Sequence, residues 1–122
     1  MNNLIKERTI IDDFKISSKE RLEAAKVIAK NFKPDLKTIC EIDLHCHSFY
    51  SDGYYSPTNK VFEAYRRGIK AIAISEHDTF DGQLEAISAG KIFNIEVIPA
   101  IEFYTGRPGV EIIIHFLNKN TF

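Results

Sequence analysis

The chain has 122 residues, of which 44% are hydrophobic and 27% are charged. These values are typical of a globular protein with at most one domain and a modest core. The formal net charge of -1 predicts neither a nucleic-acid-binding patch nor a membrane-binding surface. The charges are unevenly distributed, because residues 1–39 carry nine Lys/Arg and six Asp/Glu, whereas residues 40–122 carry seven and eleven. Bound cations would offset the acidic excess of the second part.

The two cysteines are not expected to form a disulfide. Cys40 and Cys46 are six residues apart and flank a predicted strand, where their side chains could not easily meet. Free thiols are typical of a reducing cytosol. The N-terminus lacks the apolar region of a signal peptide, and no run approaches transmembrane length. The sequence therefore predicts a cytoplasmic location.

The first 37 residues are predicted to form an N-terminal helical extension. Residues 1–16 show no clear hydrophobic period, but Ser17 and Glu20 have the spacing of a capping box. Pro34 is expected to end the helix that follows. Its apolar residues recur at helical spacing: Leu22, Ala25, Ile28, Ala29 and Phe32. We expect this helix to pack outside the domain and to take no part in chemistry.

From residue 38 the pattern becomes an alternation of strands and helices. Helices are predicted after Ser56-Pro57, ending at Gly68, and after Asp81-Gly82, ending near Ile92. Strands are predicted over Thr38–Leu44, Ile69–Ser75, Glu96–Ile101 and Val110–Leu117. This order indicates an α/β fold with a mainly parallel sheet.

Candidate metal ligands stand at or near the end of each predicted strand. In an extended segment His45 and His47 share one face, and Cys46 points to the other. Ligands gather at the carboxyl ends of strands in open α/β sheets and barrels. Imidazole and carboxylate groups together bind divalent cations. The predicted ligands are His45, His47, Asp52, His77, Glu102 and His115.

Some neighbouring polar residues allow two interpretations. His115 lies among apolar residues, where a histidine is usually only hydrogen-bonded, so its assignment depends on the other ligands. Asp43, Glu76 and Asp78 either orient the imidazoles or make strand-end and cap hydrogen bonds. Arg107 either meets a substrate phosphate or is solvated in its loop.

The order and spacing of these motifs resemble the PHP (polymerase and histidinol phosphatase) superfamily. The matching motifs are Asp43-Leu-His-Cys-His-Ser48, Ser51-Asp-Gly53, Ser56-Pro57, Ser75-Glu-His-Asp-Thr79 with Gly82, and Ile98-Pro-Ala-Ile-Glu102. The resemblance implies a distorted (βα)7 barrel with two or three divalent metals at the strand C-termini. By this resemblance, the six predicted ligands match metal-binding positions of the family. The resemblance also implies that Glu102 bridges two ions.

The implied activity is hydrolysis of phosphomono- or phosphodiesters by a metal-activated water, with Zn, Mn or Fe as the metal. The motif forms are similar to those of stand-alone phosphoesterases that act on nucleotides or short nucleic acids. No catalytic residue beyond the metal-bound water is expected, and Cys46 is a poor nucleophile because it faces away.

The chain departs from the family pattern in several places. Glu76 stands where Asp is usual, and Ala100 stands where Gly is usual. A further His and a final Asp-x-His motif are absent, and a complete barrel needs roughly 250 residues. We therefore expect residues 38–122 to be the first half of a PHP domain, with an exposed sheet edge that a second copy or another chain completes. The alternative is a truncated or degenerate, non-catalytic metal-binding or interaction domain.

Overall fold

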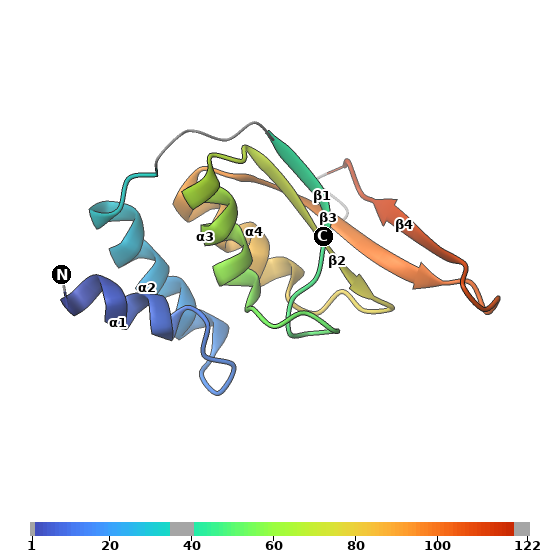
Figure 1. The fold of residues 1–122 in the computed structure, drawn as a ribbon, viewed down its shortest axis with the longest axis horizontal. Coiled ribbons are helices and arrows are strands. Elements are labelled where there is room, and N and C mark those ends of the chain that lie inside the picture. The colour runs from blue at the N-terminus through green and yellow to red at the C-terminus, as the bar shows by residue number, and fades with distance from the viewer. Residues whose placement is uncertain (1, 35–40, 119–122) are drawn as a thin grey trace.

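The computed structural model describes residues 2–34 and 41–118, which contain four helices and four strands (Figure 1). The helices are α1 (Asn2–Ile10), α2 (Ser18–Asn31), α3 (Pro57–Arg67) and α4 (Gln83–Phe93). The strands are β1 (Ile42–Cys46), β2 (Ala71–His77), β3 (Glu96–Tyr104) and β4 (Glu111–His115). None of the helices in the described ranges has both the length and the apolar composition needed to span a bilayer.

The four strands form one mixed sheet in the order β1-β2-β3-β4. β1, β2 and β3 are parallel, and only β4 runs antiparallel to its neighbour β3. The sheet is curled, so that its two edge strands meet. Nε2 of His115 in β4 lies 2.9 Å from the carbonyl oxygen of Leu44 in β1, at the opposite edge. The α/β fold and the mainly parallel, half-barrel sheet agree with the prediction.

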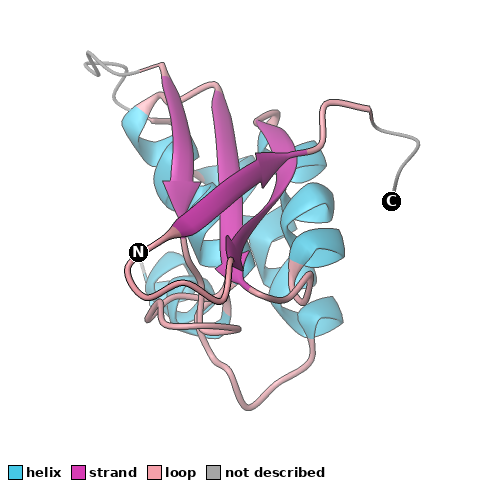
Figure 2. Cartoon of the chain, turned by 90° about the vertical axis from the view of Figure 1, so that its right-hand side faces the viewer, coloured by secondary structure: helices cyan, strands magenta, loops and turns pink. Residues whose placement is uncertain are grey.

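The helices cover one face of this sheet and leave the other open (Figure 2). Ile72 and Ile74 of β2 point toward the helices and belong to the main apolar core. α3 contributes Val61 and Phe62 to the same core, and α4 contributes Phe93. Burial of these side chains is the main stabilising contribution, at about 25 cal/mol per Å² of apolar surface. The polar residues of the strand ends are therefore free to face the open side.

Local sequence signals explain where α2 and α3 begin and end. Glu20 and Ser17 form the predicted capping box, with N–H of Ser17 2.9 Å from Oε2 of Glu20. Ser56 caps α3 by accepting a hydrogen bond from N–H of Asn59, at 2.9 Å. Gly68 ends α3 at a φ of 77°, a left-handed conformation that glycine adopts without steric cost. These termini match the predicted ones.

The N-terminal region differs from the prediction in two respects. α1 was not predicted, because its sequence has no apolar stripe; Leu4 and Ile10 are its partly buried residues against the core. α2 buries a charged residue, Arg21, beside the predicted Ala25 and Ile28. Figure 1 shows α1 and α2 stacked beside α3 and α4, on the side away from the sheet.

Arg21 joins α2 to α4 through a buried ion pair. Its Nε and Nη2 donate to the two carboxylate oxygens of Glu85, at 2.8 and 2.6 Å. Its Nη1 donates to the carbonyl oxygens of Asp13 and Ile16, at 3.0 and 2.6 Å. Both side chains are almost completely buried. A bidentate pair with this geometry fixes α2 firmly against α4.

The strand boundaries need correction. The predicted first strand begins at Thr38, which lies outside the described residues, and β1 continues to Cys46. β2 ends at His77, where its parallel ladder with β3 reaches the pair His77 and Glu102. β3 continues to Tyr104, which pairs with Glu111 of β4. β4 is shorter than predicted and ends at His115.

The start of α4 after Gly82 agrees with the prediction. Its N-cap is Gly82, which provides no side-chain hydrogen bond. N–H of Asp81, the residue before this glycine, donates to Oγ1 of Thr79 at 3.1 Å. The chain turns at Gly82 with a φ of 83°, so the backbone conformation rather than an acidic cap determines where the helix begins.

Candidate metal centre

The parallel register brings polar groups from three strands to one edge of the sheet. His45 lies near the end of β1, His77 ends β2, and Glu102 lies beside His77 in β3. His47 and Asp52 follow in the loop between β1 and α3. The carboxyl ends of parallel strands thus converge, as expected for α/β folds.

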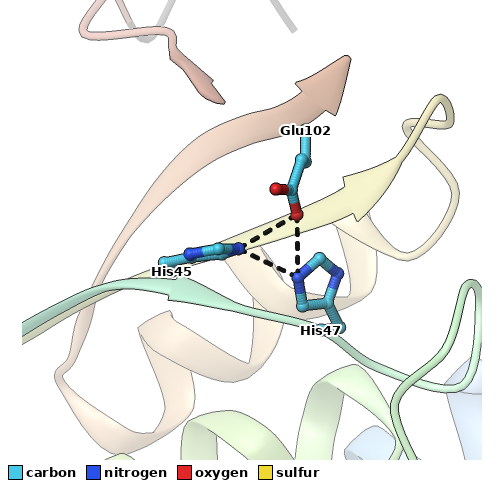
Figure 3. A group of neighbouring side chains, drawn as sticks. All are labelled: His45, His47 and Glu102. Carbon is cyan, nitrogen blue, oxygen red and sulfur yellow. Dashed lines mark hydrogen bonds and ion pairs between the residues drawn. The ribbon is translucent and has the colours of Figure 1, made fainter. Parts of the chain in front are cut away.

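His45, His47 and Glu102 form a tight triangle of ligand atoms (Figure 3). Nε2 of His45 lies 3.1 Å from Nε2 of His47 and 3.0 Å from Oε2 of Glu102. The third side, from Nε2 of His47 to Oε2 of Glu102, is 3.1 Å. Atoms bound at about 2.0–2.2 Å to a tetrahedral ion lie roughly 3.3–3.6 Å apart, so a small outward shift fits these donors to a metal.

Asp52 links His47 to His77 and completes a second group of donors. Its Oδ1 lies 3.4 Å from Nδ1 of His47, and its Oδ2 lies 3.4 Å from Nε2 of His77. The two rings are stacked, with centroids 4.6 Å apart. Because His47 belongs to both groups, the structure brings together five of the six predicted ligands in one cluster.

Glu111 is a cluster member that the sequence did not indicate. Its Oε1 lies 3.7 Å from Nδ1 of His77, and the two residues form a third group with Glu102. Ile113 pairs with Glu102 in the β3–β4 ladder, so Glu111, two residues away, faces the same side. Alternation along β4 could have identified it, but only with the hairpin register known.

The structure does not bring His115 or Arg107 into these groups. Nε2 of His115 contacts the carbonyl oxygen of Leu44 at 2.9 Å. Arg107 is exposed in the loop between β3 and β4, where its N–H lies 3.3 Å from Oγ1 of Thr105. Their roles as metal ligand and phosphate contact remain predictions from the sequence.

Glu76 contacts the loop that carries His47 and Asp52 through two serines of that loop. Its carboxylate is completely buried and accepts hydrogen bonds from N–H of Ser48, at 2.9 Å, and from the hydroxyls of Ser48 and Ser51. Oγ of Ser51 lies 3.4 Å from Nδ1 of His47. Glu76 can therefore influence the orientation of His47 indirectly.

Asp43 and Asp78 instead contact the backbone. Oδ1 of Asp43 accepts a hydrogen bond from N–H of His45 at 3.3 Å. Oδ1 of Asp78 accepts one from N–H of Tyr104 at 2.9 Å, and Asp78 has a φ of 52°. These contacts correspond to the strand-end hydrogen bonding that the sequence left open beside an imidazole-orienting role.

Cys46 faces the opposite side from the two histidines that flank it. Its Sγ donates to the carbonyl oxygen of Ala73 at 3.3 Å, and its side chain packs against the apolar core. Burial raises the pKa of the Cys46 thiol to about 12. The thiol therefore stays protonated near neutral pH, which makes it a poor nucleophile.

The comparison with protein families identifies this arrangement. The family model for the PHP domain matches residues 43–121. The chain belongs to the PHP family. The matched segment contains all five clustered ligands and the loop that connects them.

Named relatives carry this PHP segment within longer proteins. The chain is 46% identical over 76 residues to a 5'-3' exoribonuclease of Haemophilus influenzae, covering 62% of this chain and 28% of that protein. It is 37% identical over 82 residues to an error-prone DNA polymerase of Nocardia farcinica, covering 65% of this chain and 7% of that protein. The chain thus spans about a quarter or less of the length of these relatives.

A solved structure has the same fold. It is a two-domain protein of Bacteroides vulgatus that contains a predicted PHP-like metal-dependent phosphoesterase. The match has a TM-score of 0.58 and 28% identity, and it covers 72% of this chain and 30% of that chain. This PHP chain therefore belongs to a family of metal-dependent phosphoesterases, and its cluster has a donor set suited to divalent metals.

Proposed function

We propose that this PHP chain is part of a hydrolase that cleaves phosphomono- or phosphodiesters of nucleotides or short nucleic acids. The observation that carries the proposal is the triangle of His45, His47 and Glu102, whose donor atoms lie 3.0–3.1 Å apart. The 46% identity to an exoribonuclease supports a nucleic-acid substrate. We further propose that residues 38–122 form the PHP portion and residues 1–37 an extension.

The overlapping donor groups support a centre for two ions. Glu102 and His47 each belong to two of the three groups, so one carboxylate can serve neighbouring ions. Zn, Mn and Fe each suit imidazole with carboxylate ligands. Such ions, when bound, activate water and stabilise the charge on the leaving oxygen of a phosphoester.

The protein side chains position this chemistry. Glu102 is buried at the base of the cluster, whereas the side chain of His45 is about half exposed. Substrate would therefore approach over His45 and Asp52, both of which lie on the accessible side. Cys46, protonated and turned away, provides no nucleophile.

We propose that a further sheet segment covers the open edges of this half-barrel. Ile42 and Leu44 on β1, and Ile112 and Ile114 on β4, are apolar and substantially exposed. Exposed apolar side chains on edge strands favour contact with a further strand. A second copy of the chain, or another chain, could supply that segment and further ligands.

We also propose a cytoplasmic location, on the basis of the expected free thiols.

The decisive measurement is metal content per chain after incubation with Mn²⁺ and removal of free ions by size exclusion. We expect near-stoichiometric metal in the wild type and loss of most of it in Glu102→Gln. Asp81→Asn is the matched control, because it also removes one negative charge but lies on an exposed turn outside the donor groups. Equal metal content in Glu102→Gln and the wild type would contradict the proposed centre.

A non-catalytic metal-binding domain is the second candidate, because His115, a predicted ligand, contacts the carbonyl oxygen of Leu44 and lies outside the donor groups. The two functions differ in turnover. Hydrolysis of bis(p-nitrophenyl) phosphate or of a 5'-phosphorylated oligonucleotide by the Mn²⁺-loaded wild type, absent in Glu102→Gln, supports the phosphoesterase. Stoichiometric metal without turnover of either substrate supports the binding domain.

A further inference from the structure

The loop that carries two cluster residues is closed at its base. This metal loop, residues 47–56, contains His47 and Asp52 and connects β1 to α3. N–H of Phe49 donates to the carbonyl oxygen of Tyr55 at 2.9 Å, which joins the two ends of the loop. Buried Glu76 holds its inner side through the two serines described above. The position of Asp52 therefore depends on how the base of the loop is held.

The N-terminal hairpin, which we define as residues 2–34, holds one end of that base. Oδ1 of Asp12 accepts a hydrogen bond from N–H of Ser56 at 2.9 Å. The hydroxyl of Ser56 donates to the carbonyl oxygen of Ile11. Ser56 is completely buried, so these bonds are shielded from water.

Arg21 holds the other end of the base. Its guanidinium lies 5.2 Å from the centre of the Phe49 ring, within the range of a cation–π interaction. The same guanidinium is fixed by both oxygens of Glu85 and is 2% exposed. Oε1 of Glu85 also accepts a hydrogen bond from Oγ1 of Thr58 at 2.7 Å, two residues after Ser56. The hairpin thus contacts both ends of the metal loop through rigid groups.

We infer that the N-terminal hairpin is a positioning element of the metal centre, in which Asp12 and Arg21 set where the metal loop presents Asp52. Asp52 has a largely exposed carboxylate that reaches His47 and His77 at 3.4 Å each, so a small displacement of the loop separates it from both. The hairpin lies outside residues 43–121, the segment that the PHP family model matches. The positioning role rests on the proposed metal-dependent function.

The test compares three variants of the full chain at neighbouring acidic positions. Asp12→Ala removes the acceptor for Ser56, whereas Asp12→Asn keeps an oxygen in the same place. Asp13→Ala is the charge-matched control, because the carboxylate of Asp13 accepts its hydrogen bond from N–H of Lys15, at 2.8 Å, and not from the metal loop. We expect Asp12→Ala to raise the dissociation constant for Mn²⁺ about 10-fold, and the other two variants to stay within about 2-fold of the wild type.

A second readout needs no metal. Amide hydrogen exchange of residues 49–55 in the metal-free chain should be faster in Asp12→Ala than in Asp13→Ala, because only the former frees the base of the loop. Phe49→Leu, which removes the ring beside Arg21 and keeps an apolar side chain, serves as the second variant should Asp12→Ala fail to fold. We expect it to weaken Mn²⁺ binding in the same direction.

The outcomes separate this inference from the proposed function. Wild-type affinity for Mn²⁺ in both Asp12→Ala and Phe49→Leu overturns the positioning role and leaves the metal centre standing. Equal weakening in Asp12→Ala and Asp13→Ala also overturns it, since the effect would then follow charge or general stability. A wild-type chain that binds no Mn²⁺ contradicts the metal centre and the positioning role together.

Discussion

Two of the places where ionisable side chains gather in the described part of this PHP chain are built differently. At the first, Arg21 and Glu85 neutralise each other, and every guanidinium nitrogen has an acceptor within 3.0 Å. At the second, within the described residues, the ion pairs of Glu102 and Asp52 are with histidine rings rather than with Lys or Arg. The first site contains its own cation, the guanidinium of Arg21. The second site presents donor atoms that suit a bound metal ion.

The difference separates a structural role from a functional one. A buried pair with complete hydrogen bonding holds two elements together, and removal of one partner leaves an uncompensated charge. Carboxylates and imidazoles that converge without a Lys or Arg side chain gain more from a bound divalent ion than from each other. The first site explains the attachment of α2 to α4, and the second provides a group of donors at the strand ends that could hold a metal ion.

The largest expected effect comes from breaking the buried pair. Glu85→Ala leaves the guanidinium of Arg21 buried without its carboxylate, and we expect the free energy of unfolding to fall by about 3–5 kcal/mol. Urea unfolding followed by circular dichroism measures this loss. The double variant Arg21→Met with Glu85→Leu should recover most of it, because no charge stays buried. A loss below about 1 kcal/mol in Glu85→Ala would show that the pair behaves as a surface salt bridge.

The second effect concerns the site that lacks a cation. Mn²⁺ at about 100 times its dissociation constant should stabilise the wild type by about 2.7 kcal/mol. Glu102→Gln should abolish this gain, yet the metal-free variant should unfold within about 1 kcal/mol of the wild type, because no cationic partner is stranded. Thermal unfolding with and without Mn²⁺ measures both quantities. If metal-free Glu102→Gln were as unstable as Glu85→Ala, the two sites would not differ in their contribution to the free energy of unfolding.

A smaller loss of stability is expected from a substitution at Gly53, where the metal loop lies close to the backbone of His47. A Cβ at Gly53 would lie 2.4 Å from the carbonyl oxygen of His47, so Gly53→Ala must displace the loop. We expect a loss of about 1–3 kcal/mol in stability together with weaker Mn²⁺ binding.

Gly106→Ala is the matched control for this loop variant. A Cβ there meets nothing within 4 Å, but its φ of +80° makes alanine unfavourable by about 1–2 kcal/mol. It should therefore lose stability and keep its affinity for Mn²⁺. Equal Mn²⁺ affinities in Gly53→Ala and Gly106→Ala would mean that the position of the metal loop does not control the centre.

The sequence by itself determined the features that local stereochemistry controls. Alternation along an extended strand places His45 and His47 together and Cys46 on the opposite side. The capping residue Ser17 and the terminal Gly68 mark helix ends within one turn of the chain, so their partners are known from spacing alone. The parallel strand order and the convergence of ligands at one sheet edge follow from the same rules.

Only the tertiary structure decided which distant residues meet. Arg21 and Glu85 are 64 positions apart, and nothing in the helical pattern of α2 indicates that a charged residue is buried there. The place of Glu111 beside His77 depends on the β3–β4 register, and the contact of His115 with Leu44 depends on the curl of the sheet. Register and curl are set by the packing of the whole domain, because local spacing constrains only neighbours along the chain.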